Sequence, residues 1–440
     1  MADLFTNIPL PALTGAPTVY PCGDGAEMLL YTDADKSAAD AYIDALIAAG
    51  FALVERSELN TSSFATLRKD GMTIVIDRFE DELRVIADPY TAPYKLDDPC
   101  ERTAQTTIWQ HEVDHTLIDC GMCFILRCCD GSFFVIDSGH YFQVNDNDRI
   151  HRFMRERTPA GEKIRIAGWF LTHAHTDHVS KFSDFLRYNM DDCELEALYY
   201  NFPDPFPPAG AGWGKRGNSM MAFNLAKQLA ELPELPKIKL HTGQHFAVRN
   251  LHFTVLCTHE DVFPTENSDF NNTTTMLMME AEGTKVLFCG DASDDQSDIC
   301  ERRYGEGLAC DILQVAHHGH HGCSARFYDL ARGKAALFSN TQIFYDLDLI
   351  KEKEANETIL RHAREVYISS NGTVGADLPY THFEVYPDET FEDFEKIQQL
   401  WGYTYTPERK AELYAAYLAR GGKESHIFYR DPNSSRWHDH

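Results

Sequence analysis

The stretch Leu171-Thr172-His173-Ala174-His175-Thr176-Asp177-His178 places three histidines and one aspartate within six consecutive residues. An apolar run at 164–171 leads into it, and apolar residues at helical spacing follow it between 179 and 188. The pattern predicts a turn that leads from a buried strand into a helix. Side chains on such a turn can converge on one point, and clustered imidazoles and carboxylates indicate metal binding.

His173 and His175 stand two residues apart, so both should point to one side of an extended chain. Asp177 and His178 are adjacent and should point elsewhere. We therefore expect one ion on His173 and His175, and a second ion on Asp177 and His178. Imidazole ligands suit Zn²⁺, and the carboxylate leaves Mn²⁺ or Fe as alternatives.

Two later segments end apolar strands in a similar way. Asp291 follows an apolar run at 286–289 and Gly290, so we expect it to bridge the two ions. The pair His317-His318 follows the apolar run 312–315. The sequence does not separate these two histidines, and each is a candidate ligand. Residues at strand ends are well placed for a site because a rigid sheet positions them.

The H-x-H-x-D-H motif at 173–178, Gly290-Asp291 after a strand and the later histidine resemble the metallo-β-lactamase superfamily. The segments 271–275, 286–291 and 311–319 are similar to its branch that includes the nuclease-like domain of DNA-uptake (competence) proteins and related phosphodiesterases. The resemblance covers residues 105–385. It implies an α/β protein with the αβ/βα sandwich fold, in which Asp137 orients the site by hydrogen bonds and is not a ligand.

One departure from that family concerns the first ion. Many members carry a histidine shortly before the strand that precedes the Gly-Asp motif, whereas Asn271 and Asn272 stand in this region here. The ion on His173 and His175 is then expected to lack its usual third histidine, unless His259 or one of the pair at 317–318 replaces it.

The resemblance and the ligand pattern together imply a dinuclear metal-dependent hydrolase. Two ions about 3.5–4 Å apart activate a water to hydroxide and stabilise negative charge on a phosphoryl or carbonyl oxygen. Asp177 and Asp291 are the catalytic candidates, because either can orient this hydroxide and pass a proton to the leaving group. The expected substrate is a small anionic molecule, a phosphoester or phosphodiester. A lactonase or thioesterase activity and a non-catalytic metal-bound scaffold are the alternatives.

The charge balance restricts the partners. The chain has 40 Lys and Arg against 68 Asp and Glu, a formal net charge of −28. Such a surface repels phosphate backbones and anionic membranes, so nucleic acid is an unlikely substrate. The N-terminus lacks a signal-peptide pattern, and no window reaches the roughly 20 apolar residues of a membrane span. The 12 irregularly spaced cysteines are typical of buried thiols, so we expect a cytoplasmic protein. The oligomeric state is left open.

The chain is expected to have three parts: residues 1–98, a small α+β module of unknown role; residues 105–385, the hydrolase domain; and residues 386–440, a helical extension. The motif Cys120-Gly-Met-Cys123 is a lone C-x-x-C, which strand spacing explains better than a zinc or redox site. An irregular insert at 203–218 carries Trp213, Lys215 and Arg216, and is a candidate rim for an anionic substrate.

Overall fold

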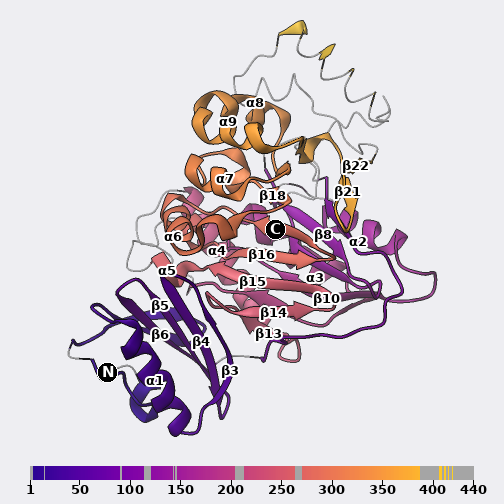
Figure 1. Cartoon of the computed structure of the whole chain (residues 1–440). Coiled ribbons are helices and arrows are strands. Elements are labelled where there is room, and N and C mark those ends of the chain that lie inside the picture. Colours follow the sequence, from indigo (N-terminus) through magenta and orange to yellow (C-terminus); the bar gives the residue numbers. More distant parts are fainter. Residues whose placement is uncertain are drawn as a thin grey trace.

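The computed structural model of the chain describes residues 3–386, except 14, 90–91, 113–119, 142, 144–145, 204–212 and 263–269, together with 406–408, 411–412, 415 and 419. The described strands form three sheets, of which the N-terminal one stands apart from the other two (Figure 1). The expected helical extension at 386–440 lies mostly outside the described residues. The division of the chain into domains stays a prediction.

The N-terminal sheet is antiparallel and carries one helix. Its elements are β1 (Thr18–Gly23), β2 (Ala26–Tyr31), α1 (Lys36–Ala48), β3 (Ala52–Glu58), β4 (Ser62–Lys69), β5 (Met72–Phe79) and β6 (Glu82–Asp88), after a short 3-10 helix, η1 (Asp3–Asn7). The strand order is β1-β2-β6-β5-β4-β3. The Asp35 carboxylate caps α1 by accepting a hydrogen bond from the Ala38 N–H, a common way to begin a helix. Strand β1 was not expected from the sequence, because its Pro21 and Gly23 weaken a strand signal.

The second sheet contains the strand that leads into the histidine cluster. Its strands are β7 (Thr107–Gln110), β8 (Cys123–Arg127), β9 (Phe133–Asp137), β10 (Ile164–Phe170), β11 (Cys193–Leu195), β12 (Leu198–Tyr200), β13 (Lys237–Lys239), β21 (Val374–Asp377) and β22 (Glu384–Val385). β8 and β9 pair antiparallel across the turn at Asp130-Gly131, whereas β9, β10, β12 and β13 run parallel. The parallel strands bring the carboxyl ends of β9 and β10 to one edge.

The third sheet contains the strands that lead to Asp291 and to the pair at 317–318. Its strands, in spatial order, are β14 (His245–Val248), β15 (Leu251–Cys257), β16 (Met276–Ala281), β17 (Thr284–Phe288), β18 (Ile312–Gln314), β19 (Ala335–Phe338) and β20 (Glu365–Ile368). β17, β18, β19 and β20 are parallel, so their carboxyl ends also share one edge.

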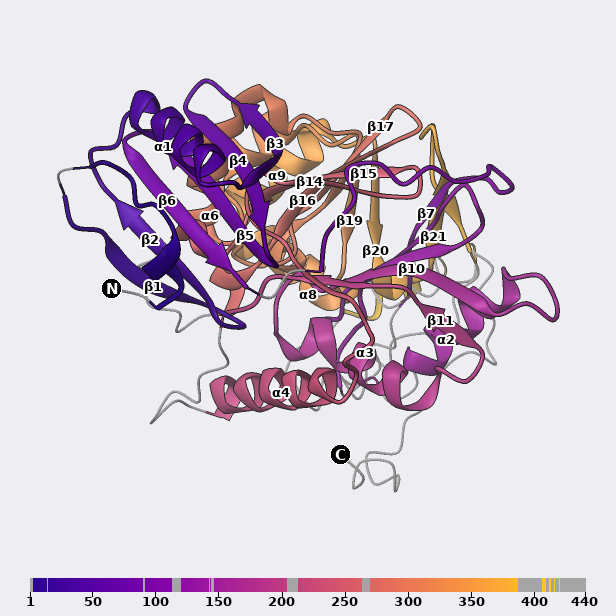
Figure 2. The same cartoon turned by 90° about the horizontal axis from the view of Figure 1, so that it is seen from below.

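These two sheets pack face to face around a core of inward-pointing residues such as Phe124, Phe170 and Phe288. Helices cover both outer faces: α2 (Asp146–Glu156), α3 (Thr176–Tyr188) and α4 (Trp213–Ala230) on one side, and α6 (Asp294–Tyr304), α7 (Ala325–Ala331) and α9 (Lys353–His362) on the other (Figure 2). On the first side, the rings of Phe182 and Phe185 lie 4.9 and 5.0 Å from Trp169 of β10. The predicted αβ/βα sandwich is therefore confirmed.

Short helices complete the sandwich: α5 (His259–Val262), α8 (Gln342–Lys351), η2 (Phe270–Thr273), η3 (Gly305–Leu308), η4 (Ala316–Gly319) and η5 (Ser369–Asn371). None of the helices in the described ranges is long and apolar enough to cross a membrane.

The N-terminal sheet meets the sandwich through a group of buried charges, Asp77, Asp261 and Arg303, called here the junction cluster. From the C-terminal end of α6, Arg303 places Nη2 3.0 Å from Asp77 Oδ2 and Nη1 2.9 Å from Asp261 Oδ1. Asp77 belongs to β5 and Asp261 to α5, so one guanidinium joins the N-terminal sheet to the sandwich.

Candidate metal centre

The predicted strand-to-helix turn is present. β10 ends at Phe170 and α3 begins at Thr176, with His175 as the N-terminal cap residue of the helix. Asp177 lies in the first turn of α3, where the helix dipole favours a carboxylate. The Thr275 N–H donates to the Thr172 carbonyl at 2.9 Å, which fastens this turn to the opposite sheet.

Asp291 follows β17 on a turn that only glycine can form. Gly290 has φ +51°, and a Cβ there would lie 2.7 Å from Thr274 Cγ2. The Gln314 side-chain oxygen accepts hydrogen bonds from the N–H groups of Cys289 and Gly290, at 2.7 and 2.6 Å. The neighbouring strand β18 thus holds the turn, and Asp291 is directed to the edge between the sheets.

The structure collects six of the seven predicted ligands into two groups. The Asp177 group contains Asp177, His178, Asp291 and His318, and the His173 group contains His173, His175 and Asp291. Within each group, one ligand atom from every residue lies within 4.8 Å of the others. Asp291 belongs to both groups, so it lies where a ligand that bridges two ions would lie.

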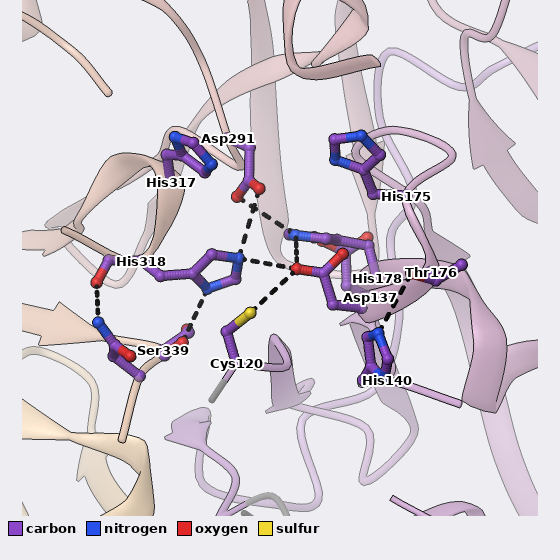
Figure 3. A network of polar contacts seen from close by, with 12 residues as sticks. Cys120, Asp137, His140, His175, Thr176, His178, Asp291, His317, His318 and Ser339 are labelled. Carbon is purple, nitrogen blue, oxygen red and sulfur yellow. Dashed lines mark hydrogen bonds and ion pairs between the residues drawn. The ribbon is translucent and has the colours of Figure 1, made fainter. Parts of the chain in front are cut away.

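The atoms of the Asp177 group are spaced as ligands of one ion. His318 Nε2 lies 3.1 Å from Asp177 Oδ2 and 3.3 Å from Asp291 Oδ2 (Figure 3). His178 Nε2 lies 3.2 Å from Asp291 Oδ1 and 3.7 Å from Asp177 Oδ2. Nitrogen and oxygen ligands about 2.0–2.1 Å from zinc in a tetrahedron are about 3.3 Å apart. The donor set therefore fits a divalent ion.

Hydrogen bonds on the far side of two rings turn their Nε2 atoms toward the carboxylates. His178 Nδ1 lies 2.7 Å from Asp137 Oδ2, and His318 Nδ1 lies 2.7 Å from the Ser339 carbonyl oxygen. Asp137 also accepts from the Thr172 N–H at 2.8 Å and hydroxyl at 2.7 Å. Asp137 thus contacts His178 and the turn, and it lies outside both donor groups.

Two atoms of the Asp177 group have a further property that fits an ion. Among the described residues, His178 Nε2 and Asp291 Oδ1 are buried and face each other at 3.2 Å, and neither atom has a well-aligned hydrogen bond. Burying a polar atom without a partner is unfavourable, so such atoms are rare unless a ligand satisfies them. An ion between these two atoms would satisfy both.

The His173 group is smaller. His173 Nε2 lies 3.0 Å from His175 Nδ1 and 3.6 Å from Asp291 Oδ2. The Thr172 hydroxyl lies 3.0 Å from His173 Nδ1 and helps to orient that ring. Within the described ranges, this group offers three donors, and the ring of Phe270 lies 5.5 Å from His175.

His259 and His317 lie outside both groups. His317 Nε2 faces Asn271 Nδ2 at 3.1 Å, and its Nδ1 lies 2.7 Å from the His321 carbonyl oxygen. His259 Nε2 contacts Asn201 Oδ1 at 3.0 Å. Among the described residues, neither histidine supplies the third imidazole that the first ion was expected to lack. The ligand role of His317 stays a prediction.

The charges of the centre depend on one another. Burial disfavours ionisation of Asp177 and Asp291, but the neighbouring His178 and His318 outweigh it and hold the pKa of both carboxyls well below the usual range. Burial likewise disfavours the imidazolium form, yet the surrounding carboxylates raise the pKa of His178 well above its usual value and that of His318 to about 10. By contrast, burial, aided by the charge of His178, lowers the pKa of His173. Protons on two imidazoles thus supply positive charge where cations would bind.

Sequence reasoning missed Cys120. Its Sγ lies 3.4 Å from Asp177 Oδ2, a contact between residues 57 positions apart (Figure 3). Strand spacing does account for Cys123, which is buried in β8, but Cys120 precedes that strand and faces the centre. No pattern of residue spacing predicts such a contact.

The rim proposed at 203–218 stays a prediction, because residues 204–212 and the side chains of 213–219 lie outside the described part.

Comparisons with known proteins are distant. No protein-family model and no curated protein matches the chain. The metallo-β-lactamase fold protein YhfI from Bacillus subtilis is 11% identical over 60% of this chain and 96% of its own, with a TM-score of 0.36. CmlA, a diiron β-hydroxylase from Streptomyces venezuelae, is 12% identical over 64% of this chain and 55% of its own, with a TM-score of 0.37. A putative metal-dependent hydrolase from Parabacteroides distasonis is 11% identical over 73% of this chain and 99% of its own, with a TM-score of 0.29. Similarities this distant do not assign a reaction, which must come from the site.

Proposed function

We propose that the chain is a dinuclear metal-dependent hydrolase of the metallo-β-lactamase superfamily that acts on a small phosphoester or phosphodiester. The observation that carries this proposal is the position of Asp291, which belongs to both donor groups. A carboxylate shared by two sets of ligands keeps two ions close together, as two-metal hydrolysis requires. The segments 271–275 and 311–319 support the branch of DNA-uptake proteins and related phosphodiesterases.

Two divalent ions, zinc or alternatively manganese or iron, would supply an activated water and stabilise charge that develops on the substrate. The chain itself orients His178 through Asp137, orients His318 through the Ser339 carbonyl, and buries both rings. The Asp177 side chain is 13% exposed, whereas that of Asp291 is 2% exposed. Asp177 is therefore better placed to exchange a proton with a leaving group, and Asp291 to hold the two groups together.

The charge of the chain supports a small substrate. A formal net charge of −28 opposes binding of a long polyanion, whereas a small phosphoester brings few charges and meets the ions directly. We expect little DNA binding. Tight binding that weakens steeply with added salt would contradict this part of the proposal.

The test combines metal analysis with turnover. Purified protein should contain about two equivalents of zinc, manganese or iron and should cleave bis-p-nitrophenyl phosphate. Turnover of lactones or thioesters alone would replace the proposed substrate class by a carbon-centred one. Bound metal without turnover on phosphoester, lactone or thioester panels, with any of the three metals, would indicate a scaffold and reject the hydrolase.

A further inference from the structure

We propose that Cys100 and Cys129 form a redox-active pair that closes into a disulfide bond under oxidising conditions. The bond would fasten the segment between β6 and β7 to the sandwich. The cysteines of this chain were expected to be buried thiols, and Cys100 differs because it is only half-buried. The inference does not depend on the reaction assigned to the candidate metal centre.

The two sulfur atoms already face each other. Cys100 Sγ lies 3.4 Å from Cys129 Sγ, although the two residues are 29 positions apart in the chain. A disulfide bond is about 2.05 Å long, so the sulfurs need to approach each other by about 1.4 Å. Small rotations of the two side chains can supply this movement.

Backbone hydrogen bonds hold the two cysteines together. The Cys129 carbonyl accepts from the N–H groups of Thr103 and Ala104, at 2.7 and 2.8 Å. These residues follow Cys100 by three and four positions. On its other side, the Cys129 N–H donates to Asn250 Oδ1 at 2.8 Å. The two thiols are therefore kept close together without a covalent bond between them.

The segment that carries Cys100 is also held to the sandwich by ion pairs. Asp98 Oδ2 lies 2.7 Å from Arg249 Nη1, and Arg102 Nη2 lies 2.5 Å from Glu282 Oε1. The Arg102 side chain is 58% exposed, so its ion pair contributes little to stability. Cys100 lies between these two pairs in the chain. A covalent bond here would strengthen the attachment where the noncovalent contacts are weak.

The structure also indicates which cysteine is the partner. Cys128 is adjacent to Cys129, but its side chain is fully buried in the core between the two sheets. Neighbouring side chains of an extended chain point to opposite sides, so Cys129 points away from that core and toward Cys100. Cys128 is therefore a matched control for the pairing.

The reaction needs an oxidant, and a small disulfide such as oxidised glutathione supplies it. The half-buried Cys100 thiolate attacks one glutathione sulfur and releases the first glutathione. The Cys129 thiolate then attacks the Cys100 sulfur and releases the second. Two cysteine thiols are oxidised, one glutathione disulfide is reduced to two thiols, and the two protons pass to these thiols. Burial and the Cys129 thiol raise the pKa of Cys100 to about 11, so the exchange should be slow at neutral pH.

The pair lies far from the candidate metal centre. Asp137, which contacts His178, pairs with Cys123 at one end of the β8–β9 hairpin, whereas Cys129 lies in the turn at the other end. Six residues of extended chain span about 20 Å. Oxidation should therefore change the stability of the chain and leave the ligands in place.

Peptide mapping without reduction tests the pairing. Native wild type, equilibrated with oxidised glutathione in mildly alkaline buffer, should yield one peptide pair that links Cys100 to Cys129, with the loss of two hydrogen atoms. Cys128→Ala should form the same link, and Cys129→Ala should not. The proposal is overturned if native wild type forms no such link, or if its Cys100 pairs with a different cysteine.

Thermal unfolding of wild type tests the effect without relying on any variant. The oxidised protein should unfold at a temperature higher by on the order of 5 °C than the same protein reduced with a phosphine, because the bond closes a loop of 29 positions. Cys129→Ala should show no such difference between the two treatments. Equal unfolding temperatures for linked and reduced wild type would reject the role in fastening this segment.

Discussion

Carboxylates are buried at two places in this molecule, and the positive charge that faces them differs in kind. In the junction cluster, Asp77 and Asp261 face the guanidinium of Arg303, which stays charged at all relevant pH values. In the candidate metal centre, Asp177 and Asp291 face imidazoles, a type of side chain that gains and loses protons and can bind metals. The first cluster carries its own permanent cation, whereas the second can exchange protons for ions. Under the proposed function, the junction cluster serves structure and the candidate metal centre serves chemistry.

The largest expected effect follows from removing the shared carboxylate. Asp291→Ala should lower kcat/KM for a phosphoester at least about 10³-fold, because the loss of a bridging ligand removes several kcal/mol of charge stabilisation. Metal analysis should also show fewer than two ions. Asp295→Ala, on an exposed position of α6, is the matched control and should keep both ions and activity. Full metal content and activity in Asp291→Ala would contradict the chemical role proposed for the candidate metal centre.

The junction cluster should respond in stability instead. The Arg303 side chain is 0% exposed, so Arg303→Met would remove the cation that pairs directly with two buried carboxylates and should lower the free energy of unfolding by about 3–5 kcal/mol. Arg302, which is 41% exposed and pairs with Glu80, is the neighbouring control, and Arg302→Met should cost less than about 1 kcal/mol. Urea denaturation measures both. A variant at 303 that loses its ions but keeps its stability would show that the two clusters are not separate in role.

A smaller effect is expected from the residue that orients His178. Asp137→Asn keeps the shape of the side chain, and asparagine tolerates the φ of 54° at this position. The variant loses the charge behind the ring, so zinc affinity should fall about 10–100-fold in a competition titration with a chromophoric chelator. An unchanged affinity would mean that the hydrogen bond from His178 Nδ1 does not tune the centre.

A pH dependence of stability is expected beside the junction cluster. His241 contacts Glu260 at 2.9 Å and Asp88 of β6 at 3.4 Å, and although burial opposes it, these carboxylates raise the pKa of His241 to about 9. Because the folded pKa exceeds the ordinary value of about 6.5, the stabilising charge is fully present below pH 6.5 and is lost as the pH rises through 9. Urea denaturation at pH 6.5 and 9 should therefore show a larger loss for wild type than for His241→Gln. Equal losses would exclude His241 as the source.

The sequence predicted those parts of the centre that depend on local geometry. His173, His175, Asp177 and His178 lie on one turn, so their spacing alone divides them between two groups. Asp291 was found by a similar argument, because it ends a strand after a glycine that the turn requires.

Contacts between distant parts of the chain were not predictable in this way. His317 and His318 are adjacent, and both have a positive φ, 48° and 59°. Their sequence spacing therefore does not tell which of the two faces the centre. His318 enters the Asp177 group because its Nδ1 meets the Ser339 carbonyl, 21 residues away. Cys120 meets Asp177 across 57 positions, and Arg303 meets Asp77 across 226. Such pairs are set by the packing of sheets and helices, which no local pattern encodes.

The length of α6 limits which insertions and deletions the chain can accept. It begins three residues after Asp291 and carries Arg303 near its other end, 11 residues in all, so it spans about 16 Å between the two clusters. A helix advances about 1.5 Å and turns about 100° with each residue. Inserting or deleting a single residue in α6 would therefore rotate the guanidinium away from its carboxylates, or turn Asp291 out of the centre. The number of residues in α6 therefore fixes the relative position of the two clusters. Substitutions on its exposed side should be accepted far more readily than any change in that number.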